Sequence, residues 1–461
     1  MHHFLPAKLK ELANACPYPL YVVGGRVRDF LAGLDADKTD TDICAPASAE
    51  DFTARAEALG FKITALYKNT GTVKLEYDGE GFEFTSFRSD EYVRGEHVPA
   101  NTFFTDDINL DARRRDFKCN AVYYDVAARK IVDPLGGIED IDNKRLDTVA
   151  PPEKVFGEDG LRLMRLARIS AQTGFIPTAN CILAARKHRE LIRDVSPERI
   201  AVEFNLILHA DARYGMNLAH YLGLKLLKNI GVLQIILPEL CAGEGLKQRK
   251  DFHKYDVLEH SLRCAAYADP SVRLAALLHD IGKPYCIEHF STFAEHDEWG
   301  AKIAAEVCER LRVPKKQAEE VCRLIDVHMY DFRGDAKENK VRKFIVENID
   351  IIDKILLIKQ ADYSAAKDDT SEAPGVTKIS GIYAKMKSEG VPFTLKELNI
   401  KGGDLLALGF PPETVGDTLE KLLMDCSIKI VANMNEKLKV YARKVYLVPI
   451  LEAASKPQSD G

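Results

Sequence analysis

The sequence lacks several features that would assign it to a specialised class of protein. Its ten cysteines include no CxxC pair, and no secretory leader is recognisable, so we expect reduced thiols in a cytoplasmic protein. No apolar run reaches the roughly 18 residues that suggest a membrane span, and there is no internal repeat or long low-complexity tract. The net charge of −6 excludes a wholly basic nucleic-acid coat, but it is compatible with a local basic groove.

The composition is that of an ordinary globular chain. Its 461 residues are 46% hydrophobic and 29% charged, which predicts roughly three domains. Residues 1–148 mix strand and helix patterns, and the chain from Pro151-Pro152 onward is predicted to be almost wholly helical. We therefore expect an α+β protein with an α/β head at 1–148, helical regions at 149–249 and 250–370, and a helical tail at 371–461.

The stretch from Tyr21 to Ala45 carries the densest set of chemically informative residues. An apolar run, a glycine pair, a short segment with Arg28 and then Asp40-Thr41-Asp42 predict strand, turn, helix and strand. Glycines let a backbone approach a phosphate, and the helical N–H groups that follow favour an anion. Asp40 and Asp42 would leave the same face of a strand, and carboxylates suit Mg²⁺ bound with substrate phosphates. The stretch indicates metal-dependent chemistry on a nucleotide, although each motif taken separately is more often a plain surface turn.

The rest of the head follows a simple pattern. A helix is predicted over 48–59, with Ser48 as its cap, and strands over 61–65, 71–77 and 81–87. In the last of these, Glu83 alternates with apolar neighbours. Residues 88–111 are predicted to form a long irregular loop, and loops of that length are usually functional or mobile.

A helix predicted over Gly157–Thr173 carries a regular series of charges. Asp159, Arg162, Arg165 and Arg168 recur every third position, which on one continuous helix makes a slanting ribbon. Such a ribbon is usually a solvated face. Here it follows a head with a metal-type motif, which favours a functional role.

Histidines and aspartates gather between residues 250 and 370. They are His260, His279, Asp280, His296, His328 and Asp362. A lone histidine is usually structural, but this many on successive predicted helices indicate a site for a divalent metal that activates water. The residues alone leave the identity of that metal open.

Five motifs in order resemble those of the bacterial-type CCA-adding tRNA nucleotidyltransferases and the related bacterial poly(A) polymerases. They are GGRVRDFLAG with DTD, RRRDFKCNA, DPLGGIEDI, EDGLRLMRLAR and PERIAVE, over residues 20–205. Residues 257–365 resemble the HD phosphohydrolase domain that many members carry, and GGDLLALGFPPETVG resembles the RNA-binding tail of the family. The resemblance implies a small polymerase-β-like nucleotidyltransferase head followed by all-helical neck, body, HD and tail domains.

The resemblance also implies roles for individual residues. Asp40 and Asp42 would be catalytic and hold Mg²⁺, with Glu83 as a further candidate carboxylate. Gly25 and Arg28 would contact the triphosphate, and Arg115 and Asp116 the sugar and phosphates. Asp159 and Arg162 would read the base edge, while Arg165 and Arg168 add phosphate or base contacts. In the HD domain His260, His279, Asp280 and Asp362 would bind a divalent metal, with His296 and His328 as further candidates.

The implied partners are CTP, ATP and the 3′ end of tRNA, with no membrane. Two departures from the family pattern bear on the products. The loop between Gly33 and Asp40 is longer and acidic, and Glu96 stands where an arginine is often found in a loop linked to the switch from C to A addition. CCA addition is the leading hypothesis; CC-only, A-only or poly(A) addition, and an HD phosphohydrolase with an RNA-binding head, are the alternatives. The sequence gives no oligomeric state.

Overall fold

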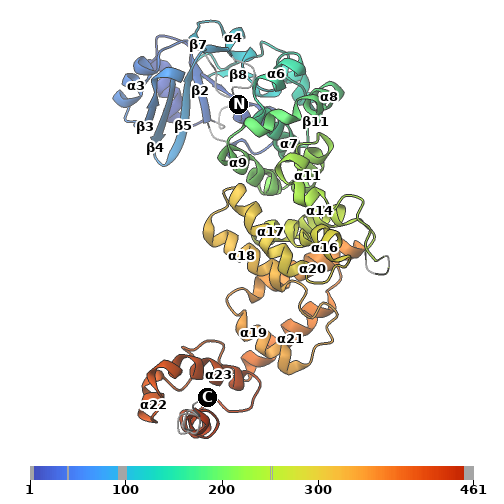
Figure 1. The fold of residues 1–461 in the computed structure, drawn as a ribbon. Helices are drawn as coiled ribbons and strands as arrows, with labels where there is room; N and C mark the ends of the chain where they lie inside the picture. Colours follow the sequence, from blue (N-terminus) through green and yellow to red (C-terminus); the bar gives the residue numbers. More distant parts are fainter. Residues whose placement is uncertain (1–4, 39–40, 92–100, 250, 252, 451–461) are drawn as a thin grey trace, which may run out of the picture. The chain divides into compact units, whose positions relative to one another are not determined.

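The structure is a computed structural model that describes residues 5–38, 41–91, 101–249, 251 and 253–450 (Figure 1). It divides into two compact units: residues 1–242 with 306–314, and residues 243–305 with 315–461. In the described part of the chain every strand belongs to the first unit. The predicted α+β class is therefore confirmed.

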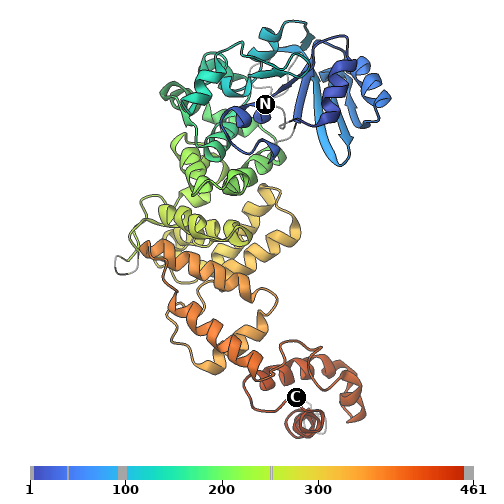
Figure 2. The same cartoon turned by 180° about the vertical axis from the view of Figure 1, so that it is seen from behind.

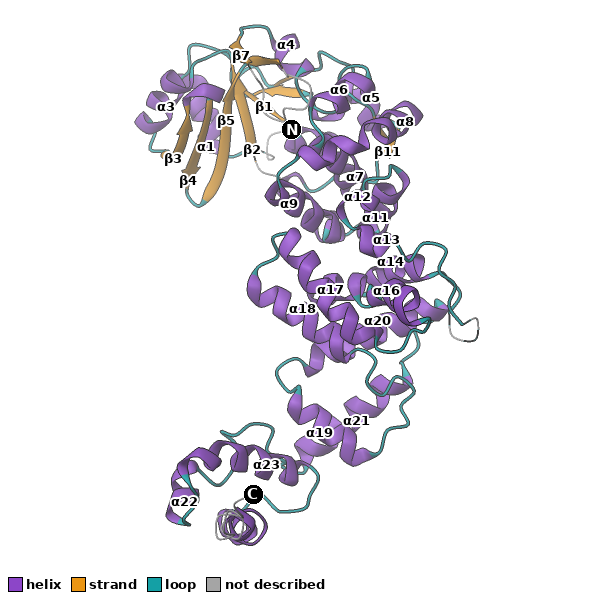
Figure 3. Cartoon of the chain, viewed as in Figure 1, coloured by secondary structure: helices purple, strands orange, loops and turns teal. Residues whose placement is uncertain are grey.

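The head is built on a seven-stranded sheet with the strand order β3-β4-β5-β2-β1-β8-β9. These strands are β1 (Tyr21–Val23), β2 (Thr41–Ala45), β3 (Lys62–Tyr67), β4 (Thr72–Tyr77), β5 (Glu80–Ser86), β8 (Tyr123–Asp125) and β9 (Lys130–Val132). Only the β2–β5 pair is parallel among them. Helix α3 (Ala49–Ala58) packs on β3, β4 and β5, with α1 (Ala7–Ala15) beside it (Figure 3). Phe52 on α3 stacks on Phe84 with ring centroids 3.7 Å apart, which anchors this layer.

The predicted strand, turn, helix and strand at the start of the head are confirmed. Strand β1 leads through Gly24 into α2 (Gly25–Leu31), and the chain returns on β2. Gly24 has φ +81°, the left-handed region that glycine tolerates best. In the sheet register Asp42 pairs with Val23 on one side and with Glu83 on the other. Because laterally paired residues share a face, the side chains of Asp42 and Glu83 lie next to each other.

The prediction of an irregular loop over 88–111 is wrong for its described residues. Strands β6 (Arg88–Glu91) and β7 (Asn101–Phe104) form an antiparallel ribbon, and α4 (Ile108–Arg113) follows. The ribbon is short and charged, so it lacks the apolar alternation that marks a strand in a sequence. Glu96 lies outside the described residues.

The predicted single helix over Gly157–Thr173 is also wrong, because the chain breaks at Asp159-Gly160. Helix α6 (Pro152–Glu158) ends there and α7 (Leu161–Thr173) begins. Asp159 is extended, and a Cβ added at Gly160 would lie 2.4 Å from the carbonyl oxygen of Leu191. A tertiary contact thus sets the break. The other elements of this unit are α5 (Gly137–Asp142), β10 (Arg145–Leu146), β11 (Ile176–Pro177), α8 (Ala179–His188), α9 (Pro197–Leu208), α10 (Ala210–Tyr214), α11 (Ala219–Asn229), α12 (Leu233–Ile236) and α13 (Pro238–Cys241).

The second unit is helical (Figure 2). Its first helices are α14 (Val257–Tyr267), α15 (Arg273–Leu278), α16 (Gly282–Phe290), the start of α17 (His296–Arg310), α18 (Lys315–Val327) and α20 (Ile352–Lys367). Its later helices are α19 (Glu338–Glu347), α21 (Pro374–Ser388), α22 (Gly402–Ala407), α23 (Val415–Ser427) and α24 (Asn435–Ala442), which runs into a π-helical turn, Arg443–Leu447. Helix α14 packs along α15 and α20.

A buried arginine ties the later helices together. Arg342 on α19 is 1% exposed and donates to Glu338, to Glu389 after α21 and to the carbonyl of Ser427 at the end of α23. All ten cysteines are free. Among the described helices, none has the length and hydropathy needed to span a membrane.

Helices α16 and α17 approach so closely that their crossing requires glycine. A Cβ added at Gly282 would lie 2.2 Å from the carbonyl oxygen of His296 and 2.6 Å from the nitrogen of Gly300. We predict that Gly282→Ala lowers the stability of the second unit by about 1–3 kcal/mol, the usual cost of overpacking. Urea denaturation followed by circular dichroism measures this.

Gly381, inside α21, is the matched control because nothing lies within 4 Å of its added Cβ. Gly381→Ala should be neutral or stabilise the helix by up to about 1 kcal/mol. Equal stability of the two variants would show that the α16–α17 crossing does not depend on glycine.

Candidate functional site

The turn of the head places a glycine directly against a carboxylate. A Cβ added at Gly24 would lie 2.8 Å from Oδ2 of Asp42, so no other residue fits here without moving that carboxylate. Gly25, the predicted phosphate contact, is the first residue of α2. Asp40 lies outside the described residues.

Glu83 extends this carboxylate pair from the neighbouring strand. It is paired in register with Asp42, and Nζ of Lys74 lies 3.8 Å from its Oε2 atom in an exposed ion pair. The position of Glu83 beside Asp42 would make it available to a cation bound by Asp42. An oxygen-only donor set of this kind is suited to a hard divalent ion.

Arg28 is buried within α2 and faces other protein groups. Its Nε and Nη2 atoms donate to Oδ1 of Asp29, at 2.8 and 2.6 Å, and its Nη1 atom donates to Oδ1 of Asn120 at 2.8 Å. Arg28 is 5% exposed and Asp29 is fully buried. These contacts fix the guanidinium rigidly next to the glycine turn.

Arg115 and Asp116, adjacent in sequence, face different surroundings. Arg115 donates to the hydroxyl of Tyr123 and to Asp111. Burial by itself raises the pKa of Asp111, but Arg115 and Arg114 outweigh it and bring this pKa to about 2. Asp116 instead accepts from Arg165. Arg115 and Asp116 therefore have no partner in common among their recorded hydrogen bonds.

The pair formed by Asp116 and Arg165 joins the head to α7. Nε and Nη2 of Arg165 lie 2.7 and 2.6 Å from Oδ2 of Asp116. Burial alone raises the pKa of Asp116, but Arg165, together with hydrogen bonds from Asn120 and from the N–H of Phe117, holds that pKa well below its usual range. Asp116, Glu203 and Asp42 together raise the pKa of Arg165.

The other arginines of α7 each have a separate partner. Arg168 donates to Glu203 on α9 at 2.6 Å, and burial, followed by the charge of Arg165, lowers its pKa. Arg162 donates to Glu158 and to the carbonyls of Val155 and Arg114. The predicted ribbon is therefore a set of fixed contacts to several elements and not one solvated face.

Asp159 occupies the break between α6 and α7. Its Oδ1 atom accepts from the N–H of Leu161 at 2.9 Å, and its Oδ2 atom lies 3.3 Å from Nη2 of Arg199 on α9. Arg199 and Glu203 were not among the predicted site residues, although both belong to the PERIAVE motif. Asn120 and Gly24 were missed as well; their signal was their place inside the RRRDFKCNA and GGRVRD motifs.

In the second unit all six predicted residues of the histidine cluster come together. Each is at most 5% exposed. The cluster groups into His260, His279 and Asp362, and into His279, Asp280 and His328, as sets able to hold a metal ion. Nε2 of His260 lies 3.0 Å from Oδ1 of Asp362.

Asp280 lies at the middle of the cluster. Its Oδ2 atom is 3.3 Å from Nε2 of His279, and its Oδ1 atom is 3.3 and 3.9 Å from Nε2 of His296 and His328. One carboxylate therefore faces imidazoles on both sides. Asp280 would therefore be able to share a divalent metal with the surrounding imidazoles.

The ring orientation of three histidines suits metal ligation. Nδ1 of His279, His296 and His328 each faces a backbone carbonyl three residues earlier, at 2.8, 2.7 and 2.6 Å. When Nδ1 carries the proton, the lone pair of Nε2 points into the cluster. Among the residues that the structure describes, none forms a hydrogen bond with the buried Nε2 atoms of His296 and His328, so the donor set fits a divalent metal.

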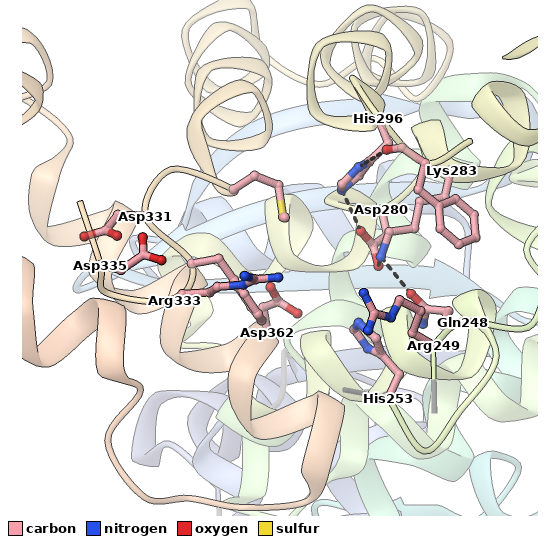
Figure 4. A pocket seen from close by; sticks show the side chains of 13 residues that line it. Gln248, Arg249, His253, Asp280, Lys283, His296, Asp331, Arg333, Asp335 and Asp362 are labelled. Carbon is pink, nitrogen blue, oxygen red and sulfur yellow. Dashed lines mark hydrogen bonds and ion pairs between the residues drawn. The ribbon is translucent and has the colours of Figure 1, made fainter. Parts of the chain in front are cut away.

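A cavity of about 470 Å³ opens beside this cluster (Figure 4). Lys283, 7% exposed, donates from Nζ to Asp280 and to Gln248, each at 2.7 Å. Arg249 and Arg333 extend into the cavity from opposite sides (Figure 4). The cavity lining also holds four aspartates, Asp280, Asp331, Asp335 and Asp362, so the cluster adjoins a cavity of mixed charge.

Comparison with family models assigns three segments of the chain. Residues 20–147 match the poly A polymerase head domain, residues 174–243 match the "Probable RNA and SrmB- binding site of polymerase A", and residues 257–366 match the HD domain. The first match contains the glycine turn and Asp42, and the last contains the whole histidine cluster.

Solved structures share this fold. A crystal structure of the Bacillus stearothermophilus CCA-adding enzyme in complex with CTP aligns with a TM-score of 0.68 at 21% identity, covering 97% of this chain and 100% of that one. The Thermotoga maritima CCA-adding enzyme complexed with tRNA aligns with a TM-score of 0.56 at 15% identity, covering 96% and 97%. These likenesses establish the fold.

Curated relatives extend over most of the chain. The A-adding tRNA nucleotidyltransferase of Deinococcus radiodurans is 29% identical over 78% of this chain and 80% of its own length. The CCA-adding enzyme of Bacillus pumilus is 35% identical, but over 41% of this chain and 46% of its own length. The multifunctional CCA protein of Stenotrophomonas maltophilia is 32% identical over 69% of this chain and 78% of its own length. With its head, its HD domain and this extent of similarity, the chain belongs to the CCA-adding tRNA nucleotidyltransferase and poly(A) polymerase family and is a nucleotidyltransferase.

Proposed function

We propose that this protein adds C, C and A from CTP and ATP to the 3′ end of tRNA without a nucleic-acid template, releasing pyrophosphate. The observation that carries the proposal is the paired carboxylates of Asp42 and Glu83 at the glycine turn, in the same compact unit as the Asp116–Arg165 pair. Relatives named CCA-adding enzymes support the same substrates, and the A-adding relative supports A-only addition as the alternative.

Mg²⁺ is the metal we assign to the head. Asp40 and Asp42 would hold it, with Glu83 as the neighbouring carboxylate, because their donor set is made of oxygen alone. When bound, Mg²⁺ would neutralise the charge of the triphosphate and of the departing pyrophosphate. The protein's own contribution is then positioning and electrostatics, which phosphoryl transfer needs most.

The remaining head residues would bind the nucleotide. Gly25 and Arg28 would lie on its triphosphate side, and Arg115 and Asp116 at its sugar and phosphates. Asp159 and Arg162 would present an acceptor and donors to the base, with Arg165 and Arg168 behind them. Arg199 holds Asp159 and Glu203 holds Arg168, so the reading groups are pre-oriented. An unmatched base would leave a buried polar group unpaired, at a cost of about 1–3 kcal/mol.

A second activity is favoured by the histidine cluster. We assign the HD domain a metal-dependent phosphohydrolase activity, because imidazole and carboxylate groups surround Asp280 and a cavity whose lining includes Arg249, Lys283 and Arg333 adjoins them. His260, His279, Asp280 and Asp362 would be the principal ligands, with His296 and His328 on the far side of Asp280. A divalent metal held there would supply an activated water.

We place these activities in four domains: a catalytic head at 1–148, a neck and body at 149–249, the HD domain at 250–370 and a tRNA-binding tail at 371–461. We also place the protein in the cytoplasm, which accords with ten free cysteines.

Incubation of the purified protein with CTP or ATP separately, on tRNA ending in no C, one C or CC, tests the main proposal. We predict CTP incorporation on the first two substrates and ATP incorporation on the third. Gel electrophoresis with radiolabelled nucleotides measures both. Complete absence of CTP uptake, with ATP still added, would replace CCA addition by A-only addition.

Substitution at each centre separates the two activities. Asp42→Ala should abolish nucleotide incorporation and leave metal-dependent phosphatase activity on p-nitrophenyl phosphate intact, because Asp42 and Asp280 belong to different compact units. Asp280→Ala should do the reverse. If Asp42→Ala kept full incorporation, the metal assignment in the head would be wrong, and a head that only binds RNA would become the better account.

A pair of glycines gives a finer control for the head. Gly24 and Gly33 both have positive φ, +81° and +70°, but an added Cβ meets Asp42 only at Gly24, whereas nothing lies within 4 Å at Gly33. Gly24→Ala should therefore lose nucleotide incorporation, as Asp42→Ala does. Gly33→Ala carries a similar backbone strain and should keep it.

A further inference from the structure

Asn120 is a buried amide that touches two charged side chains of opposite sign. It lies in the turn Lys118–Asn120 and is 6% exposed. Its Oδ1 atom accepts from Nη1 of Arg28 at 2.8 Å, and its Nδ2 atom donates to Oδ1 of Asp116 at 3.1 Å. The amide thus connects helix α2 to the RRRDFKCNA segment through both of its ends.

The charges around the amide permit one orientation. A reversed amide would turn its NH₂ group against the N–H donors of Arg28 and its oxygen against the carboxylate of Asp116. Both contacts would be repulsive. The side-chain amide of Asn120 therefore has a fixed orientation, and its two hydrogen bonds link the position of Arg28 to that of Asp116.

The contacts continue beyond Asn120 in both directions. On one side Arg28 donates to Asp29, and Asp29 accepts from the hydroxyl of Tyr214 on α10. On the other side Asp116 accepts from Arg165 on α7. The chain of contacts starts and ends in the helical neck and passes through the head, all within the first compact unit.

We propose that Asn120 is a positioning residue for nucleotidyl transfer: it holds Arg28, on the triphosphate side, and Arg165, on the base side, at a fixed separation. The inference rests on the nucleotide-binding roles proposed above for Arg28, Asp116 and Arg165. C and A differ in size but share sugar and triphosphate, so a site without a template needs these two sides held apart by the protein itself. Tyr214 fixes the far end of the same chain from α10.

The neighbouring cluster of Arg115, Asp111 and Tyr123 is not part of this series of hydrogen bonds. Arg115 is held by Asp111 and Tyr123, and none of these three residues contacts Asn120 by a hydrogen bond that the structure records. A change at Asn120 therefore acts on the Arg28–Asp116 connection and leaves the Arg115 cluster in place.

Asn120→Asp tests the proposal because it keeps the shape and breaks one of the two hydrogen bonds. The introduced carboxylate can still accept from Arg28, but it repels the Asp116 carboxylate. With full-length protein at about pH 8, kcat/KM for both CTP and ATP should fall about 10- to 100-fold, the range expected for a lost buried partner. The charged and titratable groups around this position are Arg28 and Asp29 on α2, Asp116 and Cys119 beside it, Asp140 on α5 and Arg165 on α7.

The pH profile distinguishes positioning from a loss of folding. Protonation lets the introduced carboxyl donate to Asp116 and accept from Arg28, as the amide does. Because a neighbouring carboxylate raises the pKa of the introduced group, the activity of Asn120→Asp relative to wild type should rise as the pH falls from about 8 to about 5.5. A ratio that stays constant over this range would overturn the proposal.

Two milder variants keep the test open if Asn120→Asp fails to fold. Tyr214→Phe removes one hydroxyl at the end of the chain and should raise the KM for both nucleotides about 3- to 10-fold with little change in kcat. Ser170→Ala is the control. It removes the hydrogen bond from Ser170 on α7 to the carbonyl of Phe175, at 2.8 Å, which is not part of the series that runs through Asn120. Equal kinetic effects of the two variants would contradict the proposal.

Calorimetric binding of ATP to the full-length variants separates this inference from the proposed function. If the wild-type protein binds ATP but transfers nothing, the proposed function fails, and weaker ATP binding by Asn120→Asp still supports the positioning role. If the wild-type protein transfers nucleotides and Asn120→Asp matches it in binding and in kcat/KM, the positioning role fails and the proposed function stands.

Discussion

The ion pair between Asp116 and Arg165 is the interaction on which the first unit depends. The Asp116 carboxylate is 6% exposed while the Arg165 side chain stays 36% exposed, and burying the carboxylate is unfavourable unless it is paired and hydrogen-bonded. The protein meets this condition because the amide of Asn120 and the N–H of Phe117 both donate to Asp116. Glu203 lies 4.0 Å from the guanidinium of Arg165. The pair fixes α7 against the head, and α7 in turn carries Arg162 and Arg168 to their own partners.

The two metal-type centres differ in the chemistry of their donors. In the head, carboxylates on adjacent strands lie beside a glycine turn and arginines, which suits a hard ion shared with a polyphosphate. In the second unit, four histidines surround Asp280, and the Nδ1 contacts of three of them, His279, His296 and His328, direct nitrogen lone pairs inward. Imidazole ligands favour an ion that keeps a reactive water. These two donor sets lie in separate compact units of one chain.

Local patterns predicted what local chemistry determines. The order of strand, glycine turn, helix and strand, the cap at Ser48 and the approach of six histidines and aspartates all followed from spacing and residue type. The break at Asp159-Gly160 did not, because it is set by the distant carbonyl of Leu191. The partner of each arginine could not be predicted from the sequence either. Arg162 and Arg165 have similar positions in the sequence, yet Arg162 contacts Glu158 and Arg165 contacts Asp116. Which charges meet depends on packing between elements and not on their spacing along one helix.

A double-mutant cycle on the Asp116–Arg165 pair tests most directly whether the two residues act as a unit in nucleotide transfer. The measurement is kcat/KM for the first nucleotide added by wild type, Asp116→Asn, Arg165→Gln and the double variant. If each change removes the same interaction, the double variant loses no more activity than the worse single variant. If instead the two losses multiply, the residues act independently, and the head and α7 are not coupled through this contact.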